Sequence, residues 1–145
     1  MSTEPKVSII IRTLNEGYYL PGLIGGLKTQ SYANWEIIHV DSGSTDETLN
    51  ILSPYSAQTI CITPQEFTFG YSLNLGCEAA SGEYLVIVSA HVKPVNNTWL
   101  ENLLSPFQEN NIGMVYGKQI GNDDTRIGES RDLTKTFGAK SMISI

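Results

Sequence analysis

The chain has 145 residues, 41% of them hydrophobic and 17% charged, which is typical of one globular domain with its own core. Nine Lys and Arg against fifteen Asp and Glu give a formal net charge of −6, so we expect no nucleic-acid partner. No apolar stretch reaches the roughly 20 residues of a transmembrane helix, and the N-terminus lacks a signal-peptide pattern. Cys61 and Cys77 have no disulfide or metal-site spacing, so we expect two buried thiols in a reducing compartment.

Apolar, β-branched segments alternate with segments of helical spacing along most of the chain. Ser44 and Glu47 form a capping-box pattern, with Ser44 as the expected N-cap of a short helix. Strands alternating with helices predict an α/β fold, a mostly parallel sheet with helices on both faces. The expected strands are residues 7–11, 36–40, 57–62, 84–88 and 112–116, and the expected helices are residues 20–27, 44–52, 72–80 and 99–107.

Polar residues follow three of the expected strands, where parallel sheets bind their ligands. These segments are residues 12–16, 41–44 and 89–91. A carboxylate at Asp41 can accept hydrogen bonds from a nucleobase N–H or a ribose hydroxyl, or it can cap its own turn. Because Ser44 is expected to supply the cap, we favour the ligand role for Asp41. An acid at Asp46 is explained by the helix dipole alone.

Several catalytic motifs are missing from the sequence. There is no G-x-G-x-x-G after the first strand and no G-x-x-x-x-G-K-[ST], which argues against a dinucleotide oxidoreductase and a P-loop NTPase. No G-x-S-x-G elbow is present either. A hydrolytic triad would have to use His39 or His91, and His39 lies inside a strand, where packing is its expected role. A hydrolase is therefore not favoured.

Three blocks, VSIIIRTLNE, WEIIHVDSGSTDET and NLGCEAASGEYLVIVSAHVKP, occur in the order found in family 2 glycosyltransferases. Over residues 6–119 the chain resembles the N-terminal half of that family. The resemblance implies the Rossmann-like GT-A fold, a UDP-, GDP- or dTDP-sugar donor, and Mg²⁺ or Mn²⁺. It further implies an unknown glycan or lipid-linked acceptor and a role in cell-surface polysaccharide or glycoconjugate synthesis. The implied location is the cytoplasm, and peripheral association with the inner face of the membrane is the alternative.

The resemblance also assigns roles to individual positions. Ser89, Ala90 and His91 fall on the family's Asp-X-Asp, so they are expected at the sugar and diphosphate, but both acids are replaced. Neutral His91 can ligate Mn²⁺, and protonated His91 can meet the diphosphate directly; the alternative is that it only ends the strand. The positions expected to bind the nucleotide are Arg12, Thr13, Asn15, Glu16, Asp41, Ser42, Gly43 and Asn74.

No catalytic residue can be assigned from the sequence. The resemblance makes residues 1–119 the donor-binding half-domain and residues 120–145 a polar tail at the start of an acceptor-binding part. The family's catalytic base is expected in that part, and none of the tail acids can be given the role; they are Asp123, Asp124, Glu129 and Asp132. We therefore expect a truncated chain that binds nucleotide weakly and transfers little or no sugar.

Three other classes of function stay open. The main alternative is a non-catalytic nucleotide-binding module, in which the replaced acids mark lost activity. A nucleotidyltransferase would share the parallel sheet, but the segment at residues 12–15 is not the Gly-rich basic loop typical of that class. A pure interaction domain, forming a homo-oligomer through an uncovered sheet, is the third.

Overall fold

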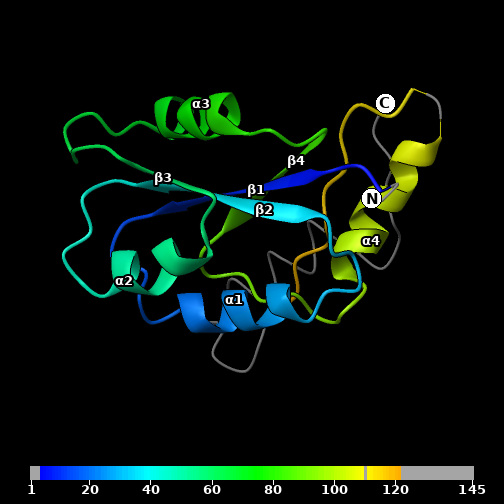
Figure 1. The fold of residues 1–145 in the computed structure, drawn as a ribbon, viewed down its shortest axis with the longest axis horizontal. Coiled ribbons are helices and arrows are strands. Elements are labelled where there is room, and N and C mark those ends of the chain that lie inside the picture. Colours follow the sequence, from blue (N-terminus) through cyan, green and yellow to red (C-terminus); the bar gives the residue numbers. More distant parts are fainter. Residues whose placement is uncertain (1–3, 110, 122–145) are drawn as a thin grey trace. The chain divides into compact units, whose positions relative to one another are not determined.

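The structure, a computed structural model, describes residues 4–109 and 111–121. The chain divides between Trp99 and Leu100 into two compact units, each described here by itself. The first unit is built on a four-stranded, all-parallel sheet with strand order β3-β2-β1-β4 (Figure 1). The strands are β1 (Val7–Thr13), β2 (Trp35–Asp41), β3 (Gln58–Cys61) and β4 (Tyr84–Ser89).

Helices cover both faces of this sheet, which confirms the α/β fold expected from the sequence. Figure 1 shows α1 and α2 on one face and α3 on the other. A short 3-10 turn, η1, follows α2 directly. The bounds are α1 (Leu20–Lys28), α2 (Thr48–Leu52), η1 (Ser53–Tyr55) and α3 (Phe69–Ala79).

The core lies between β1 and these helices. The isoleucines Ile9, Ile10 and Ile11 of β1 are fully buried, and the apolar residues that recur at helical spacing in α1 are buried as well. Helix α3 approaches β1 closely at Gly76, because a Cβ there would lie 2.5 Å from Cγ2 of Ile10. A glycine is required at this position of α3, and it sets the distance between helix and sheet.

The second unit contains the rest of α4 (Trp99–Leu104), which begins at the boundary, and the 3-10 turn η2 (Ser105–Gln108). Residues 112–116, expected as a fifth strand, have no regular secondary structure, so that prediction was wrong. Met114 and Tyr116 are 73% and 51% exposed, so the apolar spacing there marks no buried face. The four acids of the tail lie outside the described residues, and the division at residue 119 stays a prediction.

No helix within residues 4–109 and 111–121 is long and apolar enough to cross a membrane.

The topology gathers the loops that matter at one edge of the sheet. The chain proceeds from β1 through β2 to β3 in one direction, and β4 then pairs on the other side of β1. Strand order therefore reverses between β1 and β4, and ligands of open α/β sheets bind at the carboxyl edge near such a reversal. The register places Thr13 beside Asp41 and Arg12 beside Ser89 at this edge.

Candidate functional site

Asp41 ends β2 and organises the loop that follows it. Its Oδ2 accepts hydrogen bonds from the backbone N–H groups of Gly43 (3.0 Å) and Ser44 (2.8 Å). Its Oδ1 accepts from the Ser44 hydroxyl (2.5 Å) and the Thr13 hydroxyl (2.7 Å). Burial opposes ionisation of Asp41, which is 1% exposed, but these hydrogen bonds outweigh it and hold its pKa below the usual 3.8. Asp41 is therefore a fixed, ionised acceptor.

Ser44 is not the N-cap of a helix, so that expectation was wrong. Helix α2 begins at Thr48, and the Ser44 hydroxyl donates to Asp41 instead. The residue before it, Gly43, has a φ of +95°, a left-handed conformation that favours glycine, and this turn directs Ser44 back toward the carboxylate. Since Asp41 itself holds the turn, the case for its ligand role no longer rests on Ser44, and that role stays a prediction.

The loop after β1 is tied to the loop after β2. The N–H of Asn15 donates to the Ser44 hydroxyl (2.9 Å), and Asn15 Oδ1 accepts from the N–H of Thr45 (2.8 Å). The N–H of Glu16 donates to Oγ1 of Thr48, which is fully buried (2.7 Å). Asn15 has a φ of +56°, which turns the chain sharply after the strand. The sequence-predicted residues of these two loops thus form one connected structure.

The loop after β4 is tied to the loop after β1 through an ion pair. Nε2 of His91 lies 2.6 Å from Oε2 of Glu16, and the His91 ring packs edge-on against Tyr19, with 4.5 Å between ring centroids. The His91 side chain is 56% exposed and that of Glu16 is 17% exposed. The loop then reaches α1, where Pro94 contacts Gly26 so closely that a Cβ there would lie 2.6 Å from the proline. His91 is thus held in a defined position and stays open to solvent.

The remaining members of the predicted set differ in what they offer a ligand. Ser89 is exposed at the end of β4, whereas the methyl group of Ala90 is buried. Ser42 is buried, and its hydroxyl has no hydrogen-bond partner among the described residues. Asn74 is exposed on α3. The Ser89 side chain is therefore open to a ligand, while Ala90 can contribute only its backbone.

Arg12 links β1 to the start of α3. Its Nη1 donates to the carbonyl oxygen of Phe69 (2.9 Å), and its guanidinium carbon lies 5.3 Å from the centre of the Phe69 ring. Phe69 is 74% exposed, and Phe67 packs edge-on against it. An exposed ring beside a guanidinium group is a surface on which a nucleobase can stack.

Sequence reasoning missed two residues of this edge. His39 was expected to be packed, which is so, but its Nε2 also lies 2.8 Å from the Thr13 hydroxyl. Thr48, which anchors the loop after β1, was not singled out. Cys61 is exposed beside Asp41 at the end of β3, and Cys77 is partly exposed, so the expectation of two buried thiols was wrong; both cysteines are free. A pairing between strands far apart in sequence leaves no local signal.

Comparison with known proteins places this chain in a family. The chain matches the model described as glycosyl transferase family 2 over residues 8–142. The chain belongs to glycosyl transferase family 2. It is 30% identical over 141 residues to the O-antigen chain rhamnosyltransferase WbaN of Salmonella anatum, covering 96% of this chain and 45% of that protein. It is 28% identical over 130 residues to the Escherichia coli enzyme UDP-Glc:alpha-D-GlcNAc-diphosphoundecaprenol beta-1,3-glucosyltransferase WfgD, covering 85% and 49%.

Solved structures similar to this family 2 chain show the GT-A fold, as expected from the sequence. The mannosyltransferase PcManGT from Pyrobaculum calidifontis, in complex with GDP-Man and Mn²⁺, has a TM-score of 0.68 and 25% identity over 77% of this chain and 35% of that one. S. aureus TarS 1–349 in complex with UDP-GlcNAc has a TM-score of 0.59 and 22% identity, covering 78% and 38%. The chain spans less than half the length of each of these four proteins.

PcManGT was solved with Mn²⁺, and the described part of this family 2 chain offers an incomplete set of metal donors. Within residues 4–109 and 111–121 there is no group of three or more His, Cys, Asp or Glu side chains that could hold a metal ion. At the end of β4, His91 and Glu16 provide one imidazole nitrogen and one carboxylate. These are suitable donors for Mn²⁺, but two donors are too few for a complete metal site among the described residues.

Proposed function

We propose that this chain is the donor-binding part of a glycosyltransferase that uses a nucleoside-diphosphate sugar. The single observation that carries the proposal is the connected set of loops after β1, β2 and β4, which meet where strand order reverses in a chain of this family. In that arrangement the base and ribose lie over the loops after β1 and β2. The diphosphate and sugar lie at the end of β4, beside Ser89 and His91.

The proposed reaction is a displacement at the anomeric carbon of the sugar. The acceptor hydroxyl loses its proton as it attacks, the bond from the anomeric carbon to the diphosphate oxygen breaks, and the nucleoside diphosphate leaves with the electron pair. Negative charge grows on the leaving diphosphate, so a positive group there lowers the barrier. His91 is exposed and held by Glu16 and Tyr19, and as an imidazolium it can supply that charge.

A divalent cation can serve the same purpose. We propose that His91 and Glu16 would be the residues to hold Mn²⁺ if it accompanied the donor, and the ion would supply positive charge to the leaving group. No catalytic base is assigned, because the acids of the tail lie outside the described residues. The chain by itself is therefore expected to bind the donor and to transfer little or no sugar.

The acceptor and setting belong to the same proposal. WbaN is named as an O-antigen chain transferase, and the name of WfgD states a lipid-linked diphosphoundecaprenol acceptor. We propose an acceptor of this kind, a glycan or lipid-linked glycan used for cell-surface polysaccharide. A lipid-linked acceptor would bring the enzyme to the inner face of the membrane from the cytoplasm.

A binding titration tests the proposal. The chain is titrated with UDP, GDP and dTDP, each with and without Mn²⁺, and binding is followed by NMR and thermal shift. We expect one of the three to bind, and Asp41→Asn to weaken that binding about tenfold, since a hydrogen bond to a charged group is lost. Glu83→Gln, a change of an exposed carboxylate at the opposite end of the sheet, is the matched control and should leave affinity unchanged. Failure of all three nucleotides to bind this chain and a longer version would overturn the proposal.

The non-catalytic nucleotide-binding module stays the second candidate. The observation in its favour is that Ser89 and His91 stand where the family has acids, and that the described residues hold no metal-binding group. This candidate would be supported if a longer version of the protein binds nucleotide but neither transfers nor hydrolyses the sugar of any donor.

A further inference from the structure

His39 is a buried polar residue that the proposed reaction does not use. It lies on β2, in the interior of the sheet, and its side chain is fully buried. Its Nε2 lies 2.8 Å from Oγ1 of Thr13, and that hydroxyl donates to Oδ1 of Asp41 over 2.7 Å. The three side chains therefore form one chain of hydrogen bonds from the core to the predicted nucleotide-binding acid.

The protons in this chain can be placed. The Thr13 hydroxyl has one proton, and it is used in the bond to Asp41. Thr13 must then accept from His39, so the ring carries its proton on Nε2. The other nitrogen, Nδ1, has no partner among the described residues, and a proton there would be buried without an acceptor. Burial lowers the pKa of His39, although the charge of Asp41 opposes this shift. The lowered pKa also favours the neutral ring.

The carboxylate of Asp41 is held from two sides that differ in exposure. On the inner side is Thr13, buried and backed by His39. On the outer side is Ser44, which is partly exposed and donates both its hydroxyl and its N–H. All the hydrogen-bonding positions of the carboxylate are filled, so a ligand N–H can reach it only by displacing a donor. Of the two side chains that donate to the carboxylate, Thr13 is buried and Ser44 is the one that solvent can reach.

We propose that His39 is a positioning residue for nucleotide binding, acting through Thr13 on Asp41; this inference rests on the proposed function. The Nε2–H of His39 fixes the Thr13 hydroxyl so that its proton points to Asp41. The carboxylate then stays in place when a base or ribose replaces the Ser44 hydroxyl. Without the imidazole donor, the Thr13 hydroxyl is free to rotate and Asp41 loses its inner restraint.

Two substitutions separate this role from packing alone. His39→Gln places an amide N–H near the position of Nε2, whereas His39→Leu fills the space with no donor. We expect His39→Leu to weaken binding of the nucleotide found in the titration above by about tenfold, and His39→Gln by less than about threefold. In an Asp41→Asn background, His39→Leu should cause no further loss. Equal weakening in both backgrounds, or unchanged affinity in His39→Leu, would overturn the inference.

A measurement without ligand tests the hydrogen-bond chain from His39 through Thr13 to Asp41 separately from the proposed function. The ¹⁵N chemical shifts of the imidazole ring report its tautomer, and we expect neutral His39 with the proton on Nε2. Thr13→Val should alter these shifts and those of the Gly43 and Ser44 amides, while Thr13→Ser, which keeps the hydroxyl, should restore them. A proton on Nδ1, or no response to Thr13→Val, would exclude this chain of hydrogen bonds even if nucleotide binds. If these hydrogen bonds are present but the protein binds no nucleotide, the proposed function is excluded, and the positioning role of His39 is excluded with it.

Discussion

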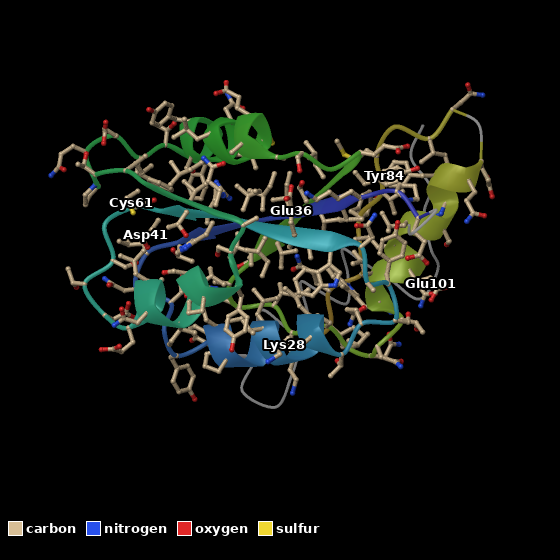
Figure 2. All side chains as sticks on the ribbon, viewed as in Figure 1. Lys28, Glu36, Asp41, Cys61, Tyr84 and Glu101 are labelled. Atoms are coloured by element: carbon tan, nitrogen blue, oxygen red, sulfur yellow. The ribbon has the colours of Figure 1, made fainter. Side chains whose placement is uncertain are left out.

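The two ends of the sheet each hold a carboxylate in a network of hydrogen bonds, but the networks differ in what surrounds them. At the amino end, Glu36 accepts from the hydroxyl of Ser8 (2.6 Å) and from the N–H and hydroxyl of Ser81 (3.0 and 2.8 Å), and it pairs with Lys6 (2.6 Å). At the carboxyl end, Asp41 holds its own loop. Figure 2 labels Asp41 near one end of the sheet, with Glu36 farther along toward the other.

The difference lies in the outer parts of the two networks. Around Glu36, the strand-end segments bond to one another, and even the Ser8 hydroxyl accepts from the N–H of Gly82 (2.8 Å). At the carboxyl end, Thr13 and Ser44 satisfy Asp41, whereas the His91 side chain is 56% exposed and contacts Glu16 and Tyr19. A satisfied acid in a network is thus a sign of stability at both ends. Exposed polar groups occur at both ends, since Lys6 beside Glu36 is 41% exposed, so the reversal of strand order between β1 and β4 is what favours the carboxyl end as the ligand site.

The largest expected effect concerns Glu36. Burial opposes its ionisation, but the hydrogen bonds from Lys6, Ser8 and Ser81 outweigh it and lower its pKa from 4.5 to about 2. That shift corresponds to about 3 kcal/mol, present above pH 4.5 and lost as the pH falls through the folded-state value. We expect Glu36→Ala to lower the free energy of unfolding by about 2 to 3 kcal/mol in denaturant titrations at pH 7 and to leave nucleotide affinity unchanged.

A matched change at the same end controls for this result. Glu83 is exposed, and Glu83→Ala should change the free energy of unfolding by less than about 0.5 kcal/mol. If Glu36→Ala weakened nucleotide binding as strongly as Asp41→Asn does, the functional contrast between the two ends would be lost.

His91 should show the opposite pattern. Its ion pair with Glu16 is exposed, so His91→Ala should cost less than about 1 kcal/mol of stability. The same change should weaken nucleoside-diphosphate binding about tenfold, because a charged hydrogen bond to phosphate is lost, and His91→Lys should recover part of it. Isothermal titration calorimetry at fixed salt measures the affinity for the nucleoside diphosphate. The affinity for the nucleoside, which has no phosphate, is the control and should not change. An equal loss for nucleoside and diphosphate would place His91 away from the phosphates.

The pH dependence of the free energy of unfolding separates the contribution of His39 from those of Glu36 and Asp41. Burial lowers the pKa of His39, so its contribution is complete above the unfolded value of 6.5 and is lost as the pH falls toward the lower folded value. Contributions from Glu36 and Asp41, whose pKa values are also lowered, are lost only below 4.5 and 3.8. The free energy of unfolding should therefore begin to fall below pH 6.5, and His39→Gln should remove this early part. Identical slopes between pH 6.5 and 4.5 in both proteins would mean that His39 does not stay neutral in the folded protein.

The smallest effect is expected at Phe69. Its exposed ring lies beside Arg12, and Phe69→Leu should weaken binding about threefold by removing a stacking surface for the base. Ile87→Ala, a change of another exposed apolar residue, is the control and should not alter affinity. If Ile87→Ala weakened binding as much as Phe69→Leu, the loss could not be assigned to base stacking.

Much of the fold could be predicted, because runs such as residues 7–11 and 84–88 are apolar and β-branched and alternate with helical spacing. The loops at the carboxyl edge followed from the same alternation. Ser44 could not be placed, because the capping-box pattern does not reveal that a strand-end acid competes for the same hydroxyl. Cys61 is exposed because β3 is an edge strand, which depends on strand order rather than on local sequence.

The His39 network shows the same limit. His39, Thr13 and Asp41 meet only because β1 and β2 pair in one register, with Thr13 opposite Asp41. A shift of one residue would turn these side chains to the opposite face. Residues 112–116 carry the composition of a strand, but an apolar run becomes a strand only where a neighbour offers an edge to pair with.

Mapping a bound nucleotide on the chain tests the central idea most directly. In an NMR titration of ¹⁵N-labelled protein with UDP, GDP or dTDP, we expect the backbone amides of Arg12, Ser42 and His91 to shift together in a saturable way. The amides of Ser8 and Ser81, around Glu36, should not move. Saturable shifts centred on Ser8 and Ser81, or none at the carboxyl edge with any of the three nucleotides, would contradict a nucleotide site there.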